Sequence, residues 1–391
     1  MLIDALSVLR WSCQSCTGPK RSFHDPTTGD PIVNTTKFPS LAGMVAHATA
    51  LGLSSGFYGD NCRCHAGEKE ANVTHYAEDA ALTLAAGFAG TKIDSCGNQR
   101  DMTTYAARFA AANRTMLVES CGNGPAGTEP KRDLPPQASY LDMLKDSCPW
   151  SFYRVSVDLG PTFLSTVYNV NRGLPFLERG PGTVPLSRPG CWAYPDMMMV
   201  GVSVPRPSPR RPVDPTPMTP VEWRTHFAMW AVTSSPLILG FDLTDKARLR
   251  AAWPIIANEE ALAVSQSWSG HPGFLVANST EVQDLAVVHG SPGTQYTNES
   301  LPSWQAWAKP LKDNGMAVVV VRVWESGADT RISLPLGEFY GPGSAPAKVA
   351  VRDIHAHTDN GTASAMLTVD LAALPGRGSV FLVLTPVAAG A

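Results

Sequence analysis

Two acidic residues, Asp94 and Asp158, each end a short apolar, strand-like segment that also carries a cation. Lys92 precedes Asp94 by two residues, and Arg154 precedes Asp158 by four. A carboxylate beside a lysine or an arginine is held ionised or has its pKa tuned, as acid/base catalysis and nucleophilic attack require. Two ordinary surface ion pairs would show the same spacing and contribute little. The surrounding elements therefore decide between the two interpretations.

Alternating helix-like and strand-like segments surround these acids. Apolar spacing predicts helices at residues 41–51, 75–86, 102–112 and 139–145, and strands at 53–58, 90–94, 115–119 and 152–159. Alternation of this size indicates an α/β fold in which helical crossovers join the strands of a parallel sheet. The pattern alone leaves open whether the sheet closes into a barrel or stays doubly wound.

The residue pattern of the chain changes from about Gly273 onward. Strand-like runs separated by Gly, Pro and Asp-Asn turns are expected at residues 316–324, 330–334, 347–354, 365–371 and 379–384. Such runs are typical of a β-sandwich. We therefore expect a catalytic domain over residues 1–270 and a C-terminal β-sandwich domain over residues 271–391.

Composition excludes some classes of protein. The chain has 391 residues, 31 basic and 34 acidic side chains and 44% hydrophobic content, enough for a large core and more than one domain. No basic patch or run of like charge indicates nucleic acid or a membrane surface as a partner. No apolar stretch reaches the roughly 18 residues that a membrane-spanning helix needs.

Cysteines and glycosylation sequons indicate a secreted protein or one of a lysosomal or vacuolar lumen. Sequons of the type Asn-x-Ser/Thr begin at Asn34, Asn72, Asn113, Asn278, Asn298 and Asn360, although chance could supply several. The eight cysteines are Cys13, Cys16, Cys62, Cys64, Cys96, Cys121, Cys148 and Cys191. The spacings Cys13-x-x-Cys16 and Cys62-x-Cys64-His65 also permit a zinc site, but we expect neither a metal nor a cofactor.

An ordered series of motifs from about Phe38 to the end of the chain resembles glycoside hydrolase family 27, the α-galactosidase and α-N-acetylgalactosaminidase family. Besides Lys92-x-Asp94, the motifs lie at Phe57–Asp60, Cys191–Met197, Trp223–Ala231, Ser235–Leu243, Asn258–Val264, Trp307–Leu311, Ala350–Ile354 and Leu374–Ser379. Their order makes the resemblance more specific than any single motif.

The resemblance implies a (β/α)8 TIM barrel with its active site at the carboxyl ends of the strands, followed by an antiparallel β-sandwich. It implies a retaining hydrolase that cleaves terminal non-reducing α-D-galactosides with two carboxyl groups. Asp94 matches the nucleophile and Asp158 matches the general acid/base. The implied partner is a galactoside, with a homodimer as an open alternative.

The resemblance also implies a set of substrate-binding residues. Lys92 matches a lysine that binds sugar hydroxyls and keeps the nucleophile charged, and Arg154 matches an arginine near the sugar 2-position. The remaining matches are Asp196, a sugar-binding acid, and the pocket-lining Tyr58 and Asp60 with Met197 beside Asp196. Core packing is an equal interpretation for Tyr58 and Met197.

The family's disulfide pattern implies two bridges. The matching pairs are Cys121 with Cys148, and Cys96 with either Cys62 or Cys64.

Three departures from the family pattern concern sugar selection. The family's first strand, with its Trp, has no counterpart, so we expect an N-terminally incomplete barrel. Segment Trp11–Cys16 lacks the acid pair that holds the sugar 4- and 6-hydroxyls, and Gly122–Gly124 replaces the element that selects the 2-substituent. We therefore expect weak α-galactosidase activity or altered specificity, toward an α-N-acetylgalactosaminide or a β-L-arabinopyranoside. The alternative is a catalytically impaired relative that binds sugar or serves structurally.

Overall fold

The computed structural model describes residues 24–25, 27–59, 75–93, 99, 101–121, 141, 144–179, 183–202, 217–289, 295–325 and 327–388, with the backbone of 2–3. The chain divides into two compact units, Met1–Arg154 and Val155–Ala391. The predicted domain boundary between residues 270 and 271 stays a prediction. Among the described residues, no helix is both long and apolar enough to cross a bilayer.

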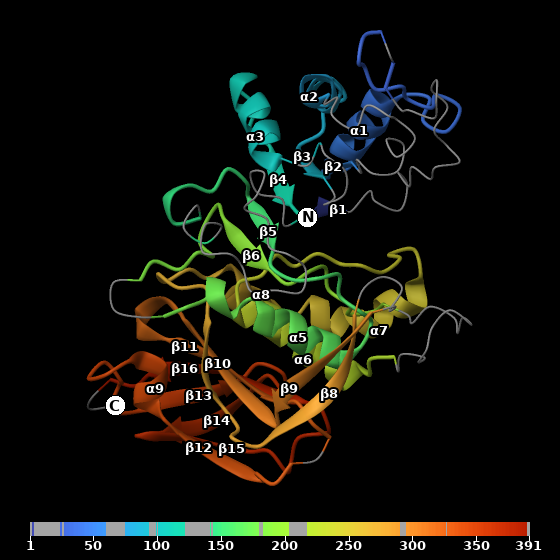
Figure 1. Cartoon of the computed structure of the whole chain (residues 1–391). Helices are drawn as coiled ribbons and strands as arrows, with labels where there is room; N and C mark the ends of the chain where they lie inside the picture. The colour runs from blue at the N-terminus through green and yellow to red at the C-terminus, as the bar shows by residue number, and fades with distance from the viewer. Residues whose placement is uncertain are drawn as a thin grey trace. The chain divides into compact units, whose positions relative to one another are not determined.

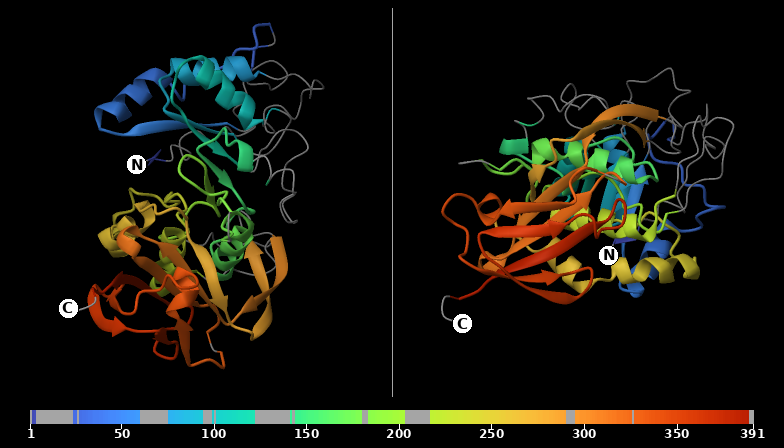
Figure 2. Two further views of the ribbon diagram at one scale, coloured as in Figure 1. Left: turned by 90° about the vertical axis from the view of Figure 1, so that its left-hand side faces the viewer. Right: turned by 90° about the horizontal axis from the view of Figure 1, so that it is seen from below.

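The first unit is a parallel sheet with helical crossovers. Its strands follow one another in chain order as β1 (Leu2–Ile3), β2 (Ser54–Gly59), β3 (Gly90–Ile93), β4 (Leu117–Ser120) and β5 (Phe152–Arg154). Helices α1 (Leu41–Ala50), α2 (Tyr76–Ala85) and α3 (Met102–Ala111) connect the strands and cover one face of the sheet (Figures 1 and 2).

Local sequence signals explain where α1 and α3 begin. The Ser40 hydroxyl accepts the N–H of Gly43 at 2.9 Å and starts α1, and the Asp101 carboxylate accepts the N–H of Thr103 to start α3. Leu41 and Val45 of α1 pack with Ala86 and Phe88, which precede β3. Apolar spacing therefore predicted these helices, and the structure shows which of their residues are buried.

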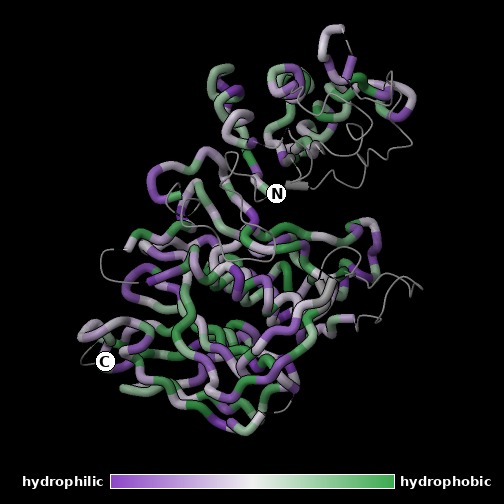
Figure 3. Tube along the Cα trace, viewed as in Figure 1, coloured by the Kyte–Doolittle hydropathy of each residue, from purple (hydrophilic) through white to green (hydrophobic). Residues whose placement is uncertain are grey.

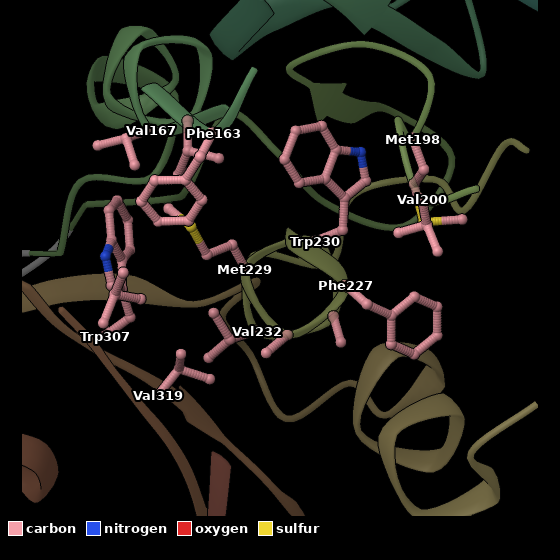
Figure 4. Packing of buried hydrophobic residues seen from close by; sticks show 14 of the residues in the cluster. Phe163, Val167, Met198, Val200, Phe227, Met229, Trp230, Val232, Trp307 and Val319 are labelled. Carbon is pink, nitrogen blue, oxygen red and sulfur yellow. The ribbon is translucent and has the colours of Figure 1, made fainter. Parts of the chain in front are cut away.

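The second unit begins with the segment that carries Asp158 and then forms helices. These are α5 (Phe163–Arg172), η4 (Leu174–Phe176), α6 (Pro220–Val232), α7 (Lys246–Ile256) and α8 (Glu259–Gln266), with the short strand β6 (Trp192–Tyr194) between η4 and α6. All six residues from Phe227 to Val232 are buried, so α6 is the central helix of this unit. Figure 4 shows cluster members from α5, α6 and the sheet together: Phe163, Val167, Met229, Val232, Trp307 and Val319.

The β-sandwich completes the second unit. Its antiparallel sheet has the order β14-β13-β16-β11-β10-β7, a second sheet pairs β12 with β15, and β8 pairs with β9. The strands are β7 (Phe274–Asn278), β8 (Val282–His289), β9 (Gln295–Pro302), β10 (Trp304–Pro310), β11 (Met316–Arg322), β12 (Arg331–Pro335), β13 (Val349–Asp353), β14 (Thr358–Ala363), β15 (Met366–Asp370) and β16 (Ser379–Pro386). The short helices η5 (Lys312–Asn314) and α9 (Leu336–Tyr340) lie between them in the chain.

Strand β11 shows why its sheet is covered on both faces. Its side chains alternate, so Ala317, Val319 and Val321 join the cluster with the helices, while Val318 and Val320 join the cluster between the two sheets. Figure 3 shows polar and apolar residues interleaved elsewhere along the strands of this unit. A continuous valine run is therefore the sequence signature of the doubly covered strand.

The fold class predicted from the sequence is confirmed. The first unit holds an incomplete TIM-barrel-like parallel sheet, and the chain ends in an antiparallel β-sandwich. One predicted strand, residues 152–159, is shorter than expected because regular strand pairing ends at Arg154. Hydrogen bonds from side chains hold the main chain of the residues that follow, Val157, Leu159 and Gly160.

Candidate functional site

In the first unit, a row of polar side chains crosses the sheet. Tyr58 on β2 lies level with Lys92 on β3, and Lys92 lies level with Glu119 on β4. Parallel neighbours at one level point to the same face. Lys92 Nζ lies 2.8 Å from Glu119 Oε1 and 5.7 Å from the centroid of the Tyr58 ring. The two charged side chains are only 13% and 12% exposed, so the ion pair is largely shielded from water.

Arg154 ends the neighbouring strand β5 and is buried. Its Nη1 donates to the sulfur of Cys121 at 3.8 Å, directly beyond the end of β4. Glu119 thus lies on a strand between two strands that carry cations. Sequence reasoning missed Glu119, although a single acid at the end of an apolar run was the available signal.

The predicted disulfide between Cys121 and Cys148 is wrong in this structure. Cys121 carries a thiol whose sulfur faces the guanidinium of Arg154, whereas Cys148 is disulfide-bonded. The other predicted bridge cannot be compared, since Cys62, Cys64 and Cys96 lie outside the described residues.

Several expected site residues also lie outside the described part of the chain. These are Asp94, Asp60 and the segment Gly122–Gly124. Their roles stay predictions. The structure does describe Lys92, two residues before Asp94, and Tyr58, two residues before Asp60.

In the second unit, the structure brings the segment of Asp158 and the carboxylate of Asp196 together. Asp196 is buried, and its Oδ2 accepts the N–H of Leu159, the residue after Asp158, at 2.8 Å. Its Oδ1 accepts the N–H of Met197 at 2.7 Å, and its carbonyl accepts the indole N–H of Trp230 at 2.9 Å. Both carboxylate oxygens thus accept main-chain hydrogens, so Asp196 organises the segment in addition to its predicted sugar-binding role.

The buried His226 of α6 bonds to the segment that follows Asp196. Its Nε2 accepts the N–H of Met199 at 3.4 Å, which leaves the proton on Nδ1 to be donated to Thr166 Oγ1 at 2.9 Å. The ring stacks on Trp230 with centroids 4.0 Å apart. Complete burial lowers the pKa of His226 from 6.5 to about 3, so the ring is neutral.

The described residues contain no cluster of three or more His, Cys, Asp or Glu side chains arranged to hold a metal ion. The sequence analysis also missed Asn169, a buried amide on α5 that bonds to both acid-bearing segments. A polar residue at an otherwise apolar helical position was its signal.

Comparisons with known proteins agree with this arrangement. Residues 302–384 match the alpha galactosidase C-terminal beta sandwich domain. The alpha-galactosidase of Cyamopsis tetragonoloba is 22% identical over 301 residues, which cover 75% of this chain and 59% of that protein. A probable alpha-galactosidase of Dictyostelium discoideum is 24% identical over 371 residues, which cover 92% and 79% of the two chains. Against the probable alpha-galactosidase D of Aspergillus fumigatus, the chain spans only 42% of the relative's length.

Solved structures share the fold. Alpha-galactosidase I from Mortierella vinacea superposes with a TM-score of 0.66 at 19% identity and covers 94% of this chain and 85% of its own. A GH27 β-L-arabinopyranosidase from Geobacillus stearothermophilus gives a TM-score of 0.66 at 17% identity, with coverage of 93% and 81%. Residues 302–384 thus match the C-terminal domain of the α-galactosidases, and the chain as a whole is similar in sequence and fold to the α-galactosidases of the glycoside hydrolase family 27 type.

Proposed function

We propose that this chain is a retaining glycoside hydrolase that removes terminal non-reducing α-D-galactosyl groups from oligosaccharides or glycoconjugates. The observation that carries the proposal is the shielded ion pair of Lys92 and Glu119 at the carboxyl end of the sheet. In TIM-barrel enzymes, catalytic residues lie at this edge. Lys92 also belongs to the motif Lys92-x-Asp94.

The reaction takes two steps. In the first, Asp94 attacks the anomeric carbon while Asp158 gives its proton to the glycosidic oxygen, and the bond between that carbon and that oxygen breaks. In the second, the Asp158 carboxylate takes a proton from water, the water oxygen bonds to the anomeric carbon, and Asp94 leaves. Lys92 and Arg154 supply positive charge near the sugar hydroxyls, and Asp196 holds the main chain beside Asp158.

The activities of related proteins support galactose as the sugar that is removed. Alpha-galactosidases recur among the sequence relatives, and an alpha-galactosidase from Saccharomyces cerevisiae has been solved with raffinose. The β-L-arabinopyranosidase shares the fold equally well, so it defines the runner-up substrate.

The direct test is a steady-state assay with the p-nitrophenyl α-galactoside beside the α-N-acetylgalactosaminide, β-L-arabinopyranoside and α-glucoside. We expect turnover of the α-galactoside, and Asp94→Asn should lower kcat by at least about 10³-fold, the scale expected for losing an essential carboxylate. The matched control is Asp359→Asn, a change at an 83% exposed carboxylate of the second unit, which should keep full turnover. Equal losses in both variants, or turnover of the α-glucoside alone, would reject the proposal.

A second candidate function is sugar binding without turnover. Gly122–Gly124 in place of the family's 2-position element favours it, because lost hydrogen-bonding partners weaken both selection and catalysis. Galactose binding by calorimetry in a protein that hydrolyses none of the four glycosides would favour this candidate.

We also propose that the protein works outside the cell or in an acidic lumen. Asn113, Asn278, Asn298 and Asn360 of the sequons are exposed and open to glycosylation. Protein from its natural source should therefore shift in mass on treatment with an amidase that removes N-linked glycans. An unchanged mass would contradict this location.

A further inference from the structure

Helix α5 buries polar side chains where apolar ones are the rule. Ser165, Thr166 and Asn169 are each fully buried within this helix. A buried polar group costs free energy unless a hydrogen bond compensates for lost water. Each of the three is hydrogen-bonded, and two of them bond to the main chain of the segments that carry Asp158 and Asp196.

Asn169 joins the two acid-bearing segments through one side-chain amide. Its Nδ2 donates to the carbonyl of Val157 at 2.9 Å and to the carbonyl of Pro195 at 3.2 Å. Its Oδ1 accepts the hydroxyl of Ser156 at 3.0 Å. The two carbonyls belong to the residues directly before Asp158 and Asp196, so both amide hydrogens are used to set the spacing of the two segments.

The main chain is held on the other side of Asp158 as well. The N–H of Leu159 donates to Asp196 Oδ2 at 2.8 Å, and the N–H of Gly160 donates to Ser165 Oγ at 2.8 Å. Val157, Leu159 and Gly160 are therefore all fixed by buried side chains. The backbone of Asp158 is clamped from both directions, although regular strand structure has ended before it.

We propose that Asn169 is a positioning residue that holds the main chain around Asp158, so that this carboxyl group stays aligned with the glycosidic oxygen. The inference rests on the proposed function, in which Asp158 is the general acid. Displacement of a catalytic group by about 1 Å can cost about 10²-fold in rate. Asn169 touches neither substrate nor reacting atoms, and it acts only through the position of Asp158.

The dependence of the rate on the leaving group separates positioning from general destabilisation. A dinitrophenyl leaving group departs without a proton, whereas a sugar leaving group needs the proton of the general acid. Asn169→Leu keeps the size of the side chain and removes its hydrogen bonds. It should lower kcat/KM for the disaccharide melibiose about 10–100-fold more than for 2,4-dinitrophenyl α-galactoside, the range expected for a misplaced general acid.

The matched control is Asn258→Leu. Asn258, which directly precedes α8, is also buried, and its Nδ2 donates to the carbonyl of Ile354 at 3.0 Å. This change removes a comparable hydrogen bond away from Asp158 and should lower both rates by one common factor. A common factor for Asn169→Leu as well would overturn the proposal. Asn169→Ser, which keeps one donor, takes its place with the same readouts if Asn169→Leu does not fold.

Amide hydrogen exchange gives a readout that needs no activity. In the folded Asn169→Leu variant, the amides of Leu159 and Gly160 should exchange at least about tenfold faster than in the wild type, since local opening governs exchange. Asn258→Leu should leave them unchanged. Unchanged exchange in Asn169→Leu would overturn the inference, whereas a wild type that hydrolyses neither glycoside would refute the proposed function instead.

Discussion

Replacing His226 with glutamine should make the protein less sensitive to acid than the wild type. The folded protein holds the ring neutral because it is completely buried, stacks on Trp230 and accepts the N–H of Met199. Glutamine can also accept one hydrogen bond and donate another, but it cannot take up a proton. The variant therefore removes the titration and keeps much of the bonding.

The magnitude follows from the pKa of His226, about 3 in the folded protein against 6.5 for an unburied histidine. Between these two values the unfolded chain binds a proton that the folded chain does not, so stability is lost as the pH falls through this window. At about 1.36 kcal/mol per pKa unit, the wild type should lose about 2 kcal/mol at pH 5 from this group. The loss should approach about 5 kcal/mol near pH 3.

Urea unfolding gives the free energy of unfolding of the wild type and of His226→Gln at pH 7.5 and at pH 5. The difference between the two proteins is then compared at the two pH values, so that the contributions of the other titrating groups cancel. Between pH 7.5 and pH 5, the difference in free energy of unfolding between the two proteins should change by about 2 kcal/mol in favour of the variant. His47→Gln, at an exposed position of α1, is the control and should show no such movement. A constant gap for His226→Gln would refute the assignment of a neutral, buried ring.

Three further measurements test the buried lysine, the shielded ion pair and the choice of sugar. Lys309, fully buried, donates to the carbonyls of Val264 and Ser265, and burial lowers its pKa from 10.5 to about 7. The unfolded chain keeps the proton that the folded chain loses, so between pH 7 and pH 9 the wild type should gain about 2 kcal/mol over Lys309→Met in urea unfolding; a gap independent of pH would contradict this. Lys92→Met and Glu119→Gln should each cost about 3 kcal/mol, because each leaves one charge where little water reaches it. In the same assay, the double variant should lose less free energy of unfolding than the two single variants lose together. Strict additivity of the two losses would show that Lys92 and Glu119 do not interact. The resemblance implies that Gly122–Gly124 replaces the element that selects the 2-substituent, so we expect kcat/KM for the p-nitrophenyl α-galactoside and α-N-acetylgalactosaminide to differ by less than about tenfold; a ratio above about 10³ would contradict that expectation.

Repetitive patterns of the chain predicted the fold well. Helical spacing after Ser40 matches α1, and the valine-rich run in residues 316–324 matches β11, which is covered on both faces. Of the strands in the β-sandwich unit, β7, β8, β9, β10 and β14 were not predicted. The polar strand Thr358–Ala363 is almost wholly exposed, and its pairing with β13 depends on tertiary context that local sequence does not encode.

The candidate site was less predictable than the fold. Resemblance supplied roles for residues such as Lys92, Arg154 and Asp196, and the structure shows what surrounds each of them. It could not supply Glu119 or Asn169, because their partners lie on other elements and only folding brings them together. The Cys121 pairing failed for a related reason: the family pattern suggested a bridge, whereas the sulfur faces a guanidinium on the next strand.

In the proposed reaction, the chain cleaves glycosides with retention of configuration, and Asp94 is the nucleophile. The most direct test is incubation with 5-fluoro-α-D-galactosyl fluoride, which forms a slowly hydrolysed glycosyl-enzyme, followed by proteolysis and mass spectrometry of the labelled peptide. We predict a single added fluorogalactosyl group on Asp94, and no label in Asp94→Asn. A label on another carboxylate, or none in a protein that turns over the p-nitrophenyl α-galactoside, would contradict the account.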